Sequence, residues 1–202
     1  MVSGTTPTRE DYYRALAQVL PEDALVVTSL GNASYLWAVI QDRAENFYVE
    51  DAMGLALPLA IGLAVAQPDR QVIVVQGDGG MLMHMGSLVT AGAVAPPNLT
   101  ILLIDNGVHG ASGGQALTST SLDYTALSKA AGLEATSIDQ PGIFAAELQT
   151  AIDSAQASLL TLKTAPDLDV VVPPEPFDPV LIKRRFESAI GVERYVHGTF
   201  AT

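Results

Sequence analysis

Residues 71–80 read Gln-Val-Ile-Val-Val-Gln-Gly-Asp-Gly-Gly, and this stretch decides the fold. Residues 71–76 predict a short strand whose apolar centre does not alternate, which is typical of a strand buried on both faces of a parallel sheet. Residues 77–80 predict a glycine-rich turn that leads into a helix. The stretch therefore indicates one strand–helix unit of an α/β protein.

Strands and helices alternate along the rest of the chain. We predict strands at residues 24–30, 71–76, 100–104 and 158–163, with a short one near Ala135. We predict helices at residues 9–19, 54–66, 81–95, 143–154 and 179–190, with one further element at 122–131. Because doubly buried strands that alternate with helices need cover on both faces, we expect a three-layer α/β/α fold around a mostly parallel sheet.

The last part of the chain differs in composition. Residues 166–179 carry five prolines and no helical period, so we predict an extended linker there. The helix that follows is expected to turn Lys183, Arg184 and Arg185 to solvent. We predict one domain over residues 1–165, with the linker and tail packed on that domain or on a partner.

Composition excludes several function classes. The 202 residues include no Cys, which excludes disulfides, a zinc ribbon and a thiol nucleophile. The net charge of −12 argues against a nucleic-acid or anionic membrane partner. The longest apolar run, residues 52–66, is shorter than the ~18 residues that indicate a membrane span. Residues 1–7 do not read as a signal peptide, so we expect a cytoplasmic protein.

Unusual residues follow three of the predicted strands, at 30–32, 77–80 and 105–107. Parallel strands bring their carboxyl ends to one edge of the sheet, where ligands bind. Glycines allow close approach of a phosphate, and the N-terminus of a helix attracts one. Asp78 would repel that phosphate unless a divalent cation lay between them, and Asn106 has an amide oxygen to offer the same ion.

The turn taken alone is weak evidence. An ordinary strand–helix turn has similar glycines, and Leu82 stands where a dinucleotide-binding fingerprint needs its third glycine. The chain also lacks the Gly-Lys-Ser/Thr end of a P-loop.

The whole pattern is more specific, because it resembles the diphosphate-binding domain of thiamine-diphosphate enzymes. The resemblance covers nearly the whole chain and is strongest to the β subunit of sulfopyruvate decarboxylases and the C-terminal part of phosphonopyruvate decarboxylases. The stretches that carry it are residues 46–56, 77–79, 98–101, 104–115 and 176–184.

The resemblance implies thiamine diphosphate and Mg²⁺ as cofactors. Magnesium would be held by the side chains of Asp78 and Asn106 and by the backbone oxygen of Val108. The backbone oxygen of Asp51 would accept from the aminopyrimidine. Met53 would lie beneath the folded cofactor, since Met fills irregular gaps. The remaining implied cofactor contacts are Gly31, Asn32, Gly77, Gly79 and Gly80.

Three residues are implied catalytic candidates: Met53, His109 and Ser112. Without the family, Met53 would be read as core, and His109 as either a proton donor or a plain loop residue. Residues 110–114 also match Gly-x-Ser-x-Gly, but Ser112 lies eight residues past Ile104, too far from a strand end for a hydrolase nucleophile. We expect a structural role for His84 and no chemical role for His197.

The resemblance further implies a subunit of a two-subunit 2-keto acid decarboxylase. A partner chain would bind the pyrimidine and supply the catalytic Glu, in an assembly with two copies of each chain. Two alternatives stay open, namely a carboligase that joins the decarboxylated donor to a second carbonyl and a subunit that binds without catalysis.

Charges near Met53 depart from the family. Glu50 and Asp51 stand where the relatives have small residues, and Arg43 is the nearest basic residue in the sequence. If these carboxylates faced the substrate, they would disfavour phosphono or sulfo acids. We therefore expect a less anionic 2-keto acid, unless the partner chain supplies cations.

Overall fold

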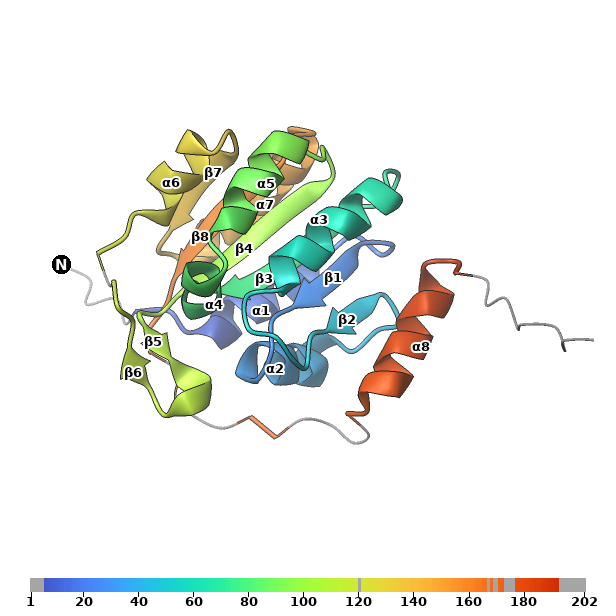
Figure 1. The fold of residues 1–202 in the computed structure, drawn as a ribbon, viewed down its shortest axis with the longest axis horizontal. Helices are drawn as coiled ribbons and strands as arrows, with labels where there is room; N and C mark the ends of the chain where they lie inside the picture. The colour runs from blue at the N-terminus through green and yellow to red at the C-terminus, as the bar shows by residue number, and fades with distance from the viewer. Residues whose placement is uncertain (1–5, 120, 167, 169–170, 173–176, 193–202) are drawn as a thin grey trace, which may run out of the picture.

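The computed structural model describes residues 6–119, 121–166, 168, 171–172 and 177–192. Its centre is a six-stranded parallel sheet with the order β2-β1-β3-β4-β8-β7 (Figure 1). These strands are β1 (Leu25–Thr28), β2 (Asn46–Tyr48), β3 (Val72–Gly77), β4 (Leu99–Asp105), β7 (Glu134–Ile138) and β8 (Ser158–Lys163). A separate antiparallel hairpin pairs β5 (Val108–His109) with β6 (Gln115–Ala116).

Helices cover both faces of the sheet, which confirms the predicted three-layer architecture (Figure 1). One layer holds α3 (Ala56–Ala66), α5 (Gly86–Val94) and α6 (Tyr124–Ala130). The other holds α1 (Arg9–Val19), α2 (Asn32–Gln41) and α7 (Pro141–Asp153). The short α4 (Asp78–Met83) follows β3 directly.

The central strands divide their side chains between the two layers. Val72 and Val74 of β3 belong to the cluster under α3 and α5, whereas Ile73 and Val75 belong to the cluster under α1, α2 and α7. All four side chains are fully buried. This two-sided burial explains why the sequence of β3 is apolar without alternation.

The strand order reverses direction between β1 and β3. From β1 the chain moves outward to β2, and from β3 it moves the other way to β4. A crevice opens at the carboxyl edge of a parallel sheet at such a switch point, and ligands bind there. The residues after β1 and β3 therefore face a shared space.

The final helix, α8 (Pro179–Ala189), packs against the edge strand β2. Its Phe186 meets Phe47 at 5.2 Å between ring centroids. Arg185, expected at a solvent-facing position, instead forms two 2.7 Å hydrogen bonds to the Asp42 carboxylate. The helix thus covers an edge that would otherwise be open to another strand.

Several boundaries differ from the prediction. Residues 81–95 do not form one helix, because the chain turns at His84, whose N–H bonds to the carbonyls of Gly80 and Met81, before α5 begins at Gly86. Helix α4 begins at Asp78, so the glycine-rich turn is its first turn. Helix α2, strand β2 and the β5–β6 hairpin were not predicted.

Part of the predicted linker, and all of the region around His197, lie outside the described residues. Of the helices in the described ranges, none combines the length and apolar character needed to cross a membrane.

Candidate active site

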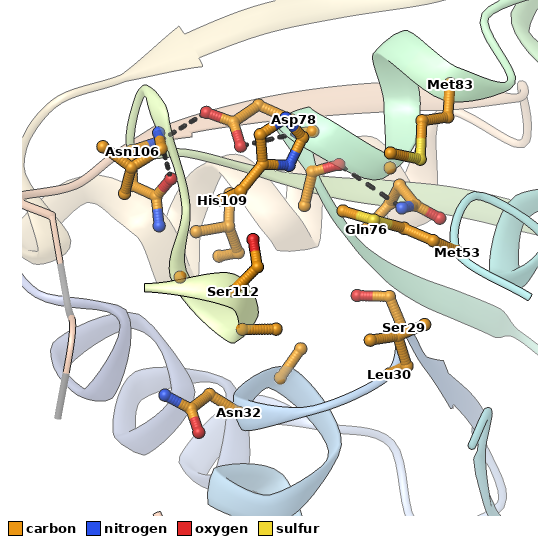
Figure 2. Close-up of a pocket in the computed structure, with 18 of the residues that line it drawn as sticks. Ser29, Leu30, Asn32, Met53, Gln76, Asp78, Met83, Asn106, His109 and Ser112 are labelled. Carbon is orange, nitrogen blue, oxygen red and sulfur yellow. Dashed lines mark hydrogen bonds between the residues drawn. The ribbon is translucent and has the colours of Figure 1, made fainter. Parts of the chain in front are cut away.

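A cavity of about 420 Å³ lies at the carboxyl edge of the sheet, at the switch point between β1 and β3 (Figure 2). Segments far apart in the sequence line it: the start of α1, the β1–α2 turn, the loop before α3, the β3–α4 turn, the end of β4 and the β5 hairpin. The sequence-predicted site residues among its lining are Asn32, Met53, Gly77, Asp78, Gly79, Gly80, Asn106, Val108, His109 and Ser112. Gly31 and Asp51 are not part of the lining.

Asp78 ties two sides of this cavity together. Its side chain is buried, and its Oδ2 accepts hydrogen bonds from the backbone N–H groups of Asn106 (2.9 Å) and Gly107 (2.7 Å). Its Oδ1 accepts from the N–H of Gly79 (2.8 Å). Burial raises the pKa of the Asp78 carboxyl, while these donors pull it down and the charge of Asp105 raises it. The carboxylate is therefore fixed in position but lacks a cationic partner in the described part of the chain.

The oxygen donors around Asp78 suit Mg²⁺. The Asn106 side chain lies beside Asp78, and its Oδ1 accepts from the N–H of Val108 at 3.0 Å (Figure 2). A carboxylate, an amide and a backbone carbonyl are hard oxygen ligands of the kind that Mg²⁺ takes alongside ligand phosphates. No group of three or more His, Cys, Asp or Glu gathers among the described residues, so one carboxylate with neutral oxygens is the donor set that this cavity offers.

Glycines in the β3–α4 turn allow close approach of the neighbouring side chains His109 and Gln76. A Cβ on Gly79 would lie 2.6 Å from Nδ1 of His109, and a Cβ on Gly80 would collide with the Gln76 amide. Gln76 is itself buried, and its Oε1 has no hydrogen-bond partner. The turn therefore needs residues without side chains so that the backbone can border the cavity.

Met53 lines the same cavity as Asp78, Gln76 and Met83 (Figure 2). It follows Ala52, whose φ of +63° is unusual for a residue with a side chain. This strained turn sets the place where Met53 enters the cavity.

The β5 hairpin carries His109 and Ser112 over the cavity. His109 packs above Gly79, whereas Ser112 is exposed and its hydroxyl donates to Oε1 of Gln115 at 2.9 Å. Ser112 stands in a short 3₁₀ turn and has an amide rather than a His as its partner. Ser112 therefore lies in a loop and not on the sharp strand-to-helix turn of a hydrolase nucleophile.

Several residues of the cavity lining were not predicted from the sequence, and among them Arg9 carries a charge. Arg9, the first residue of α1, is 7% exposed and lines the cavity. Nothing near it in the sequence carries a site motif, and only the tertiary structure brings it to this edge.

The charges expected near Met53 lie elsewhere. Glu50 and Asp51 are not part of the cavity lining, and Asp51 accepts a hydrogen bond from the N–H of Ala52. The Arg43 guanidinium donates to the backbone carbonyls of Glu22 (3.0 Å) and Ala24, and so supports the loop before β1. Neither carboxylate therefore lines this cavity, and Arg9 rather than Arg43 is the arginine in its lining. The expectation of a less anionic substrate stays a prediction.

A parallel sheet with a glycine-lined cavity at its switch point is typical of the class of α/β proteins that bind a ligand at the carboxyl edge of the sheet. Within that class, the family model described as the C-terminal TPP-binding domain of thiamine pyrophosphate enzymes matches residues 30–162. The chain belongs to this family.

Curated relatives agree with the family. The chain is 38% identical over 193 residues to a phosphonopyruvate decarboxylase of Streptomyces viridochromogenes, covering 93% of this chain but 47% of that protein. It is 32% identical over 185 residues to the sulfopyruvate decarboxylase subunit beta of Methanocaldococcus jannaschii, covering 91% of this chain and 97% of that subunit. It also covers 33% of a phosphonopyruvate decarboxylase of Streptomyces hygroscopicus. The chain thus spans less than half the length of these two phosphonopyruvate decarboxylases.

Solved structures share the fold. A thiamine diphosphate-dependent 4-hydroxybenzoylformate decarboxylase of Rhodococcus jostii superposes with a TM-score of 0.73 at 22% identity, over 84% of this chain and 34% of that one. A thiamin diphosphate-dependent enzyme of Mycobacterium smegmatis gives a TM-score of 0.70 at 23% identity, over 79% of this chain and 32% of that one.

Proposed function

We propose that this chain is the diphosphate- and magnesium-binding subunit of a thiamine-diphosphate-dependent 2-keto acid decarboxylase. The observation that carries the proposal is the buried Asp78 carboxylate, fixed by three N–H donors at the end of the cavity where Asn106 also lies. A buried anion without a cationic partner is costly, and a bound divalent cation offsets that cost.

The chain's own residues would hold the cofactor by its diphosphate end. Asp78 and Asn106 would bind Mg²⁺ through their side chains, and Val108 through its backbone oxygen. The N–H groups of the glycine-rich turn border the same end of the cavity. Bound thiamine diphosphate supplies an electron sink for the electrons released when a 2-keto acid loses carbon dioxide.

Three side chains would meet the reacting end. Met53, which lines the same cavity as Asp78, would lie beneath the cofactor. His109 lies on the hairpin beside Gly79, where its imidazole would be the candidate proton donor. Ser112 stands on the same hairpin and would face the substrate. Together with the hairpin backbone they would shield the reaction from water.

A partner chain would complete the site. We propose a pyrimidine-binding chain that supplies the catalytic Glu, in an assembly with two copies of each chain. The likeness to a sulfopyruvate decarboxylase subunit beta over 97% of that subunit supports a divided enzyme. Exposed apolar side chains at and just before α3 and on α5 also support a protein contact, since Leu55, Leu59, Val65 and Val89 are each 41–64% exposed.

Calorimetric titration tests the proposal directly. Thiamine diphosphate titrated into the chain with its partner should bind when Mg²⁺ is present and lose affinity when EDTA removes the metal. Thiamine without phosphates should bind at least tenfold more weakly. Equal affinity for thiamine and thiamine diphosphate would contradict a diphosphate-anchored cofactor.

A carboligase remains the second candidate. The chain is 34% identical over 99 residues to the acetolactate synthase isozyme 2 large subunit of Escherichia coli, covering 46% of this chain. Product analysis separates the two functions, because a decarboxylase releases an aldehyde and a carboligase releases a hydroxy ketone. A panel of pyruvate-like, branched, phosphono and sulfo 2-keto acids would also identify the substrate.

A further inference from the structure

Arg9 is a buried cation with no counter-ion among the residues that the structure describes. Its side chain lines the cavity, and its Nε and Nη1 atoms have no hydrogen-bond partner. None of the ion pairs between described residues includes it. A guanidinium buried in this way is destabilising until an anion meets it.

The position of Arg9 on its helix adds to that cost. Arg9 is the first residue of α1, where the helix dipole presents its positive end. The first turn otherwise carries Glu10 and Asp11, the charges that such a position favours. A cation here gives α1 no stability, which points to a role in binding.

Local contacts place Arg9 at the Asn106 end of the cavity. Pro7 lies two residues before Arg9, and its carbonyl accepts a hydrogen bond from the N–H of Ala165. The neighbouring N–H of Thr164 donates to the carbonyl of Asp105, the last residue of β4. The start of α1 is therefore tied to the end of β4, where Asn106 follows.

The N-terminus of α2 meets the same region. Tyr13, one turn after Arg9 and on the same face of α1, donates from its hydroxyl to the carbonyl of Ala33 at 3.1 Å. Helix α2 has ten residues, and no side chain caps its first N–H groups. Gly31 precedes it with a φ of +72°, and Asn32 and Ala33 line the cavity. Arg9 and an uncapped helix N-terminus thus lie at one end of the cavity, and both suit an anion.

We propose that Arg9 binds an oxygen of the cofactor's diphosphate, beside the N-terminus of α2 and at the same end of the cavity as Asn106. The inference rests on the proposed function, and it identifies Arg9 as the source of positive charge that the cofactor site needs in addition to Mg²⁺. A diphosphate together with the Asp78 carboxylate carries more negative charge than one Mg²⁺ neutralises. The Arg9 guanidinium supplies the additional positive charge, with a planar fork that matches phosphate oxygens.

The test uses inorganic pyrophosphate with Mg²⁺ as the probe, titrated into the full chain by calorimetry. Arg9→Met should weaken pyrophosphate and thiamine diphosphate by tenfold or more and leave the weaker affinity for thiamine unchanged. Arg9→Lys, which keeps the charge without the fork, should lie between the two. Arg14→Met is the matched control, because Arg14 lies on the exposed side of the same helix and pairs with Glu10.

Thermal unfolding of the ligand-free protein separates binding from a structural role. Arg9→Met should unfold at the same temperature as the wild type or higher, because it removes an unpaired buried charge. Magnesium pyrophosphate should raise the unfolding temperature of the wild type more than that of Arg9→Met. A lower unfolding temperature of Arg9→Met with an unchanged pyrophosphate affinity would overturn the inference.

The substrate is the other possible source of an anion, and a phosphonate probe distinguishes it. If Arg9→Met kept its affinity for magnesium pyrophosphate but lost that for a small alkylphosphonate added to the thiamine-diphosphate-loaded complex, Arg9 would anchor substrate and the inference would be wrong. In that case the proposed function would stand. Failure of the wild type to bind thiamine diphosphate would contradict both.

Discussion

At the scale of single residues, the site depends on how Asp78 is held. Its two carboxylate oxygens accept from Gly79, Asn106 and Gly107, so one side chain joins the β3–α4 turn to the loop after β4. A hydrogen bond to a charged group contributes about 1.5–3 kcal/mol. Asp78 therefore organises the loop, and in the proposed function it would also present its carboxylate to Mg²⁺.

The first prediction concerns this carboxylate. Asp78→Ala should abolish magnesium-dependent binding of thiamine diphosphate, because the diphosphate would face the turn without its bridging cation. Calorimetry on the assembled enzyme with Mg²⁺ checks the affinity, and circular dichroism checks that the variant is folded. Unchanged cofactor affinity in a folded variant would refute the metal role.

The second prediction concerns the glycine beneath His109. Gly79→Ala should weaken thiamine diphosphate binding by tenfold or more, because its Cβ would lie 2.6 Å from the His109 ring and displace the hairpin. Gly142→Ala is the control, since a Cβ there meets no atom within 4 Å. The same titration measures both variants, and equal affinities would show that this close approach is dispensable.

Site residues differ in how far the sequence reveals them. Asp78 and Asn106 are readable because each directly follows a buried strand, and parallel strands must bring their ends together. Arg9 has no such signal, since its approach depends on the packing of α1 against α2 and the β8 end. Glu50 and Asp51 are close to Met53 in the sequence but do not line the cavity, because nearness in sequence does not set the direction of a side chain.

At the scale of elements, α1 is anchored by a buried tyrosine. Tyr12 is fully buried, donates to the carbonyl of Ile138 at the end of β7 (3.1 Å), and meets Phe144 edge to face at 5.6 Å. Burial, with the charges of Asp139 and Asp11, raises the pKa of Tyr12 to about 12. The folded state therefore keeps this phenol neutral at a pH where the unfolded chain ionises it.

The third prediction follows from that difference. The contribution of Tyr12 to stability is fully present below its unfolded pKa near 10 and is lost as the pH rises from 10 to 12, by about 1.4 kcal/mol per pH unit. Tyr12→Phe should be about 1 kcal/mol less stable at pH 7, from the lost hydrogen bond. Between pH 10 and 12 it should lose stability less steeply than the wild type.

Urea unfolding at pH 7, 10, 11 and 12 measures both effects. Parallel pH dependence in the two proteins would contradict a raised pKa for Tyr12.

Elements with a strong local pattern were predicted well. Strand β8 was predicted with both of its bounds correct, and β3 and β4 to within a residue, since each is rich in buried apolar residues. Strand β2 was missed because three residues are too short to show a strand pattern in the sequence. Its pairing with β1 is what defines it as a strand. The break between α4 and α5 was missed because apolar residues continue across His84 and Met85, and only the backbone turn there separates the helices.

At the scale of the whole molecule, the parallel sheet brings the residues of the site together at one edge. Turns from β1, β3 and β4 meet at one edge, and α1 and the β5 hairpin close around them. The overall fold was predictable because buried strands alternate with helices throughout. The relation to a partner was not readable from local pattern, since it depends on which surface of the finished fold stays apolar.

Reconstitution of activity tests the central claim most directly. The fourth prediction is that the purified chain, supplied with thiamine diphosphate, Mg²⁺ and a panel of 2-keto acids, releases no carbon dioxide above background. Addition of a pyrimidine-binding partner chain should restore turnover on at least one acid, and the Asp78→Ala variant should remain inactive in the same mixture. Full turnover by the chain alone, or by the Asp78→Ala variant with the partner, would contradict the account.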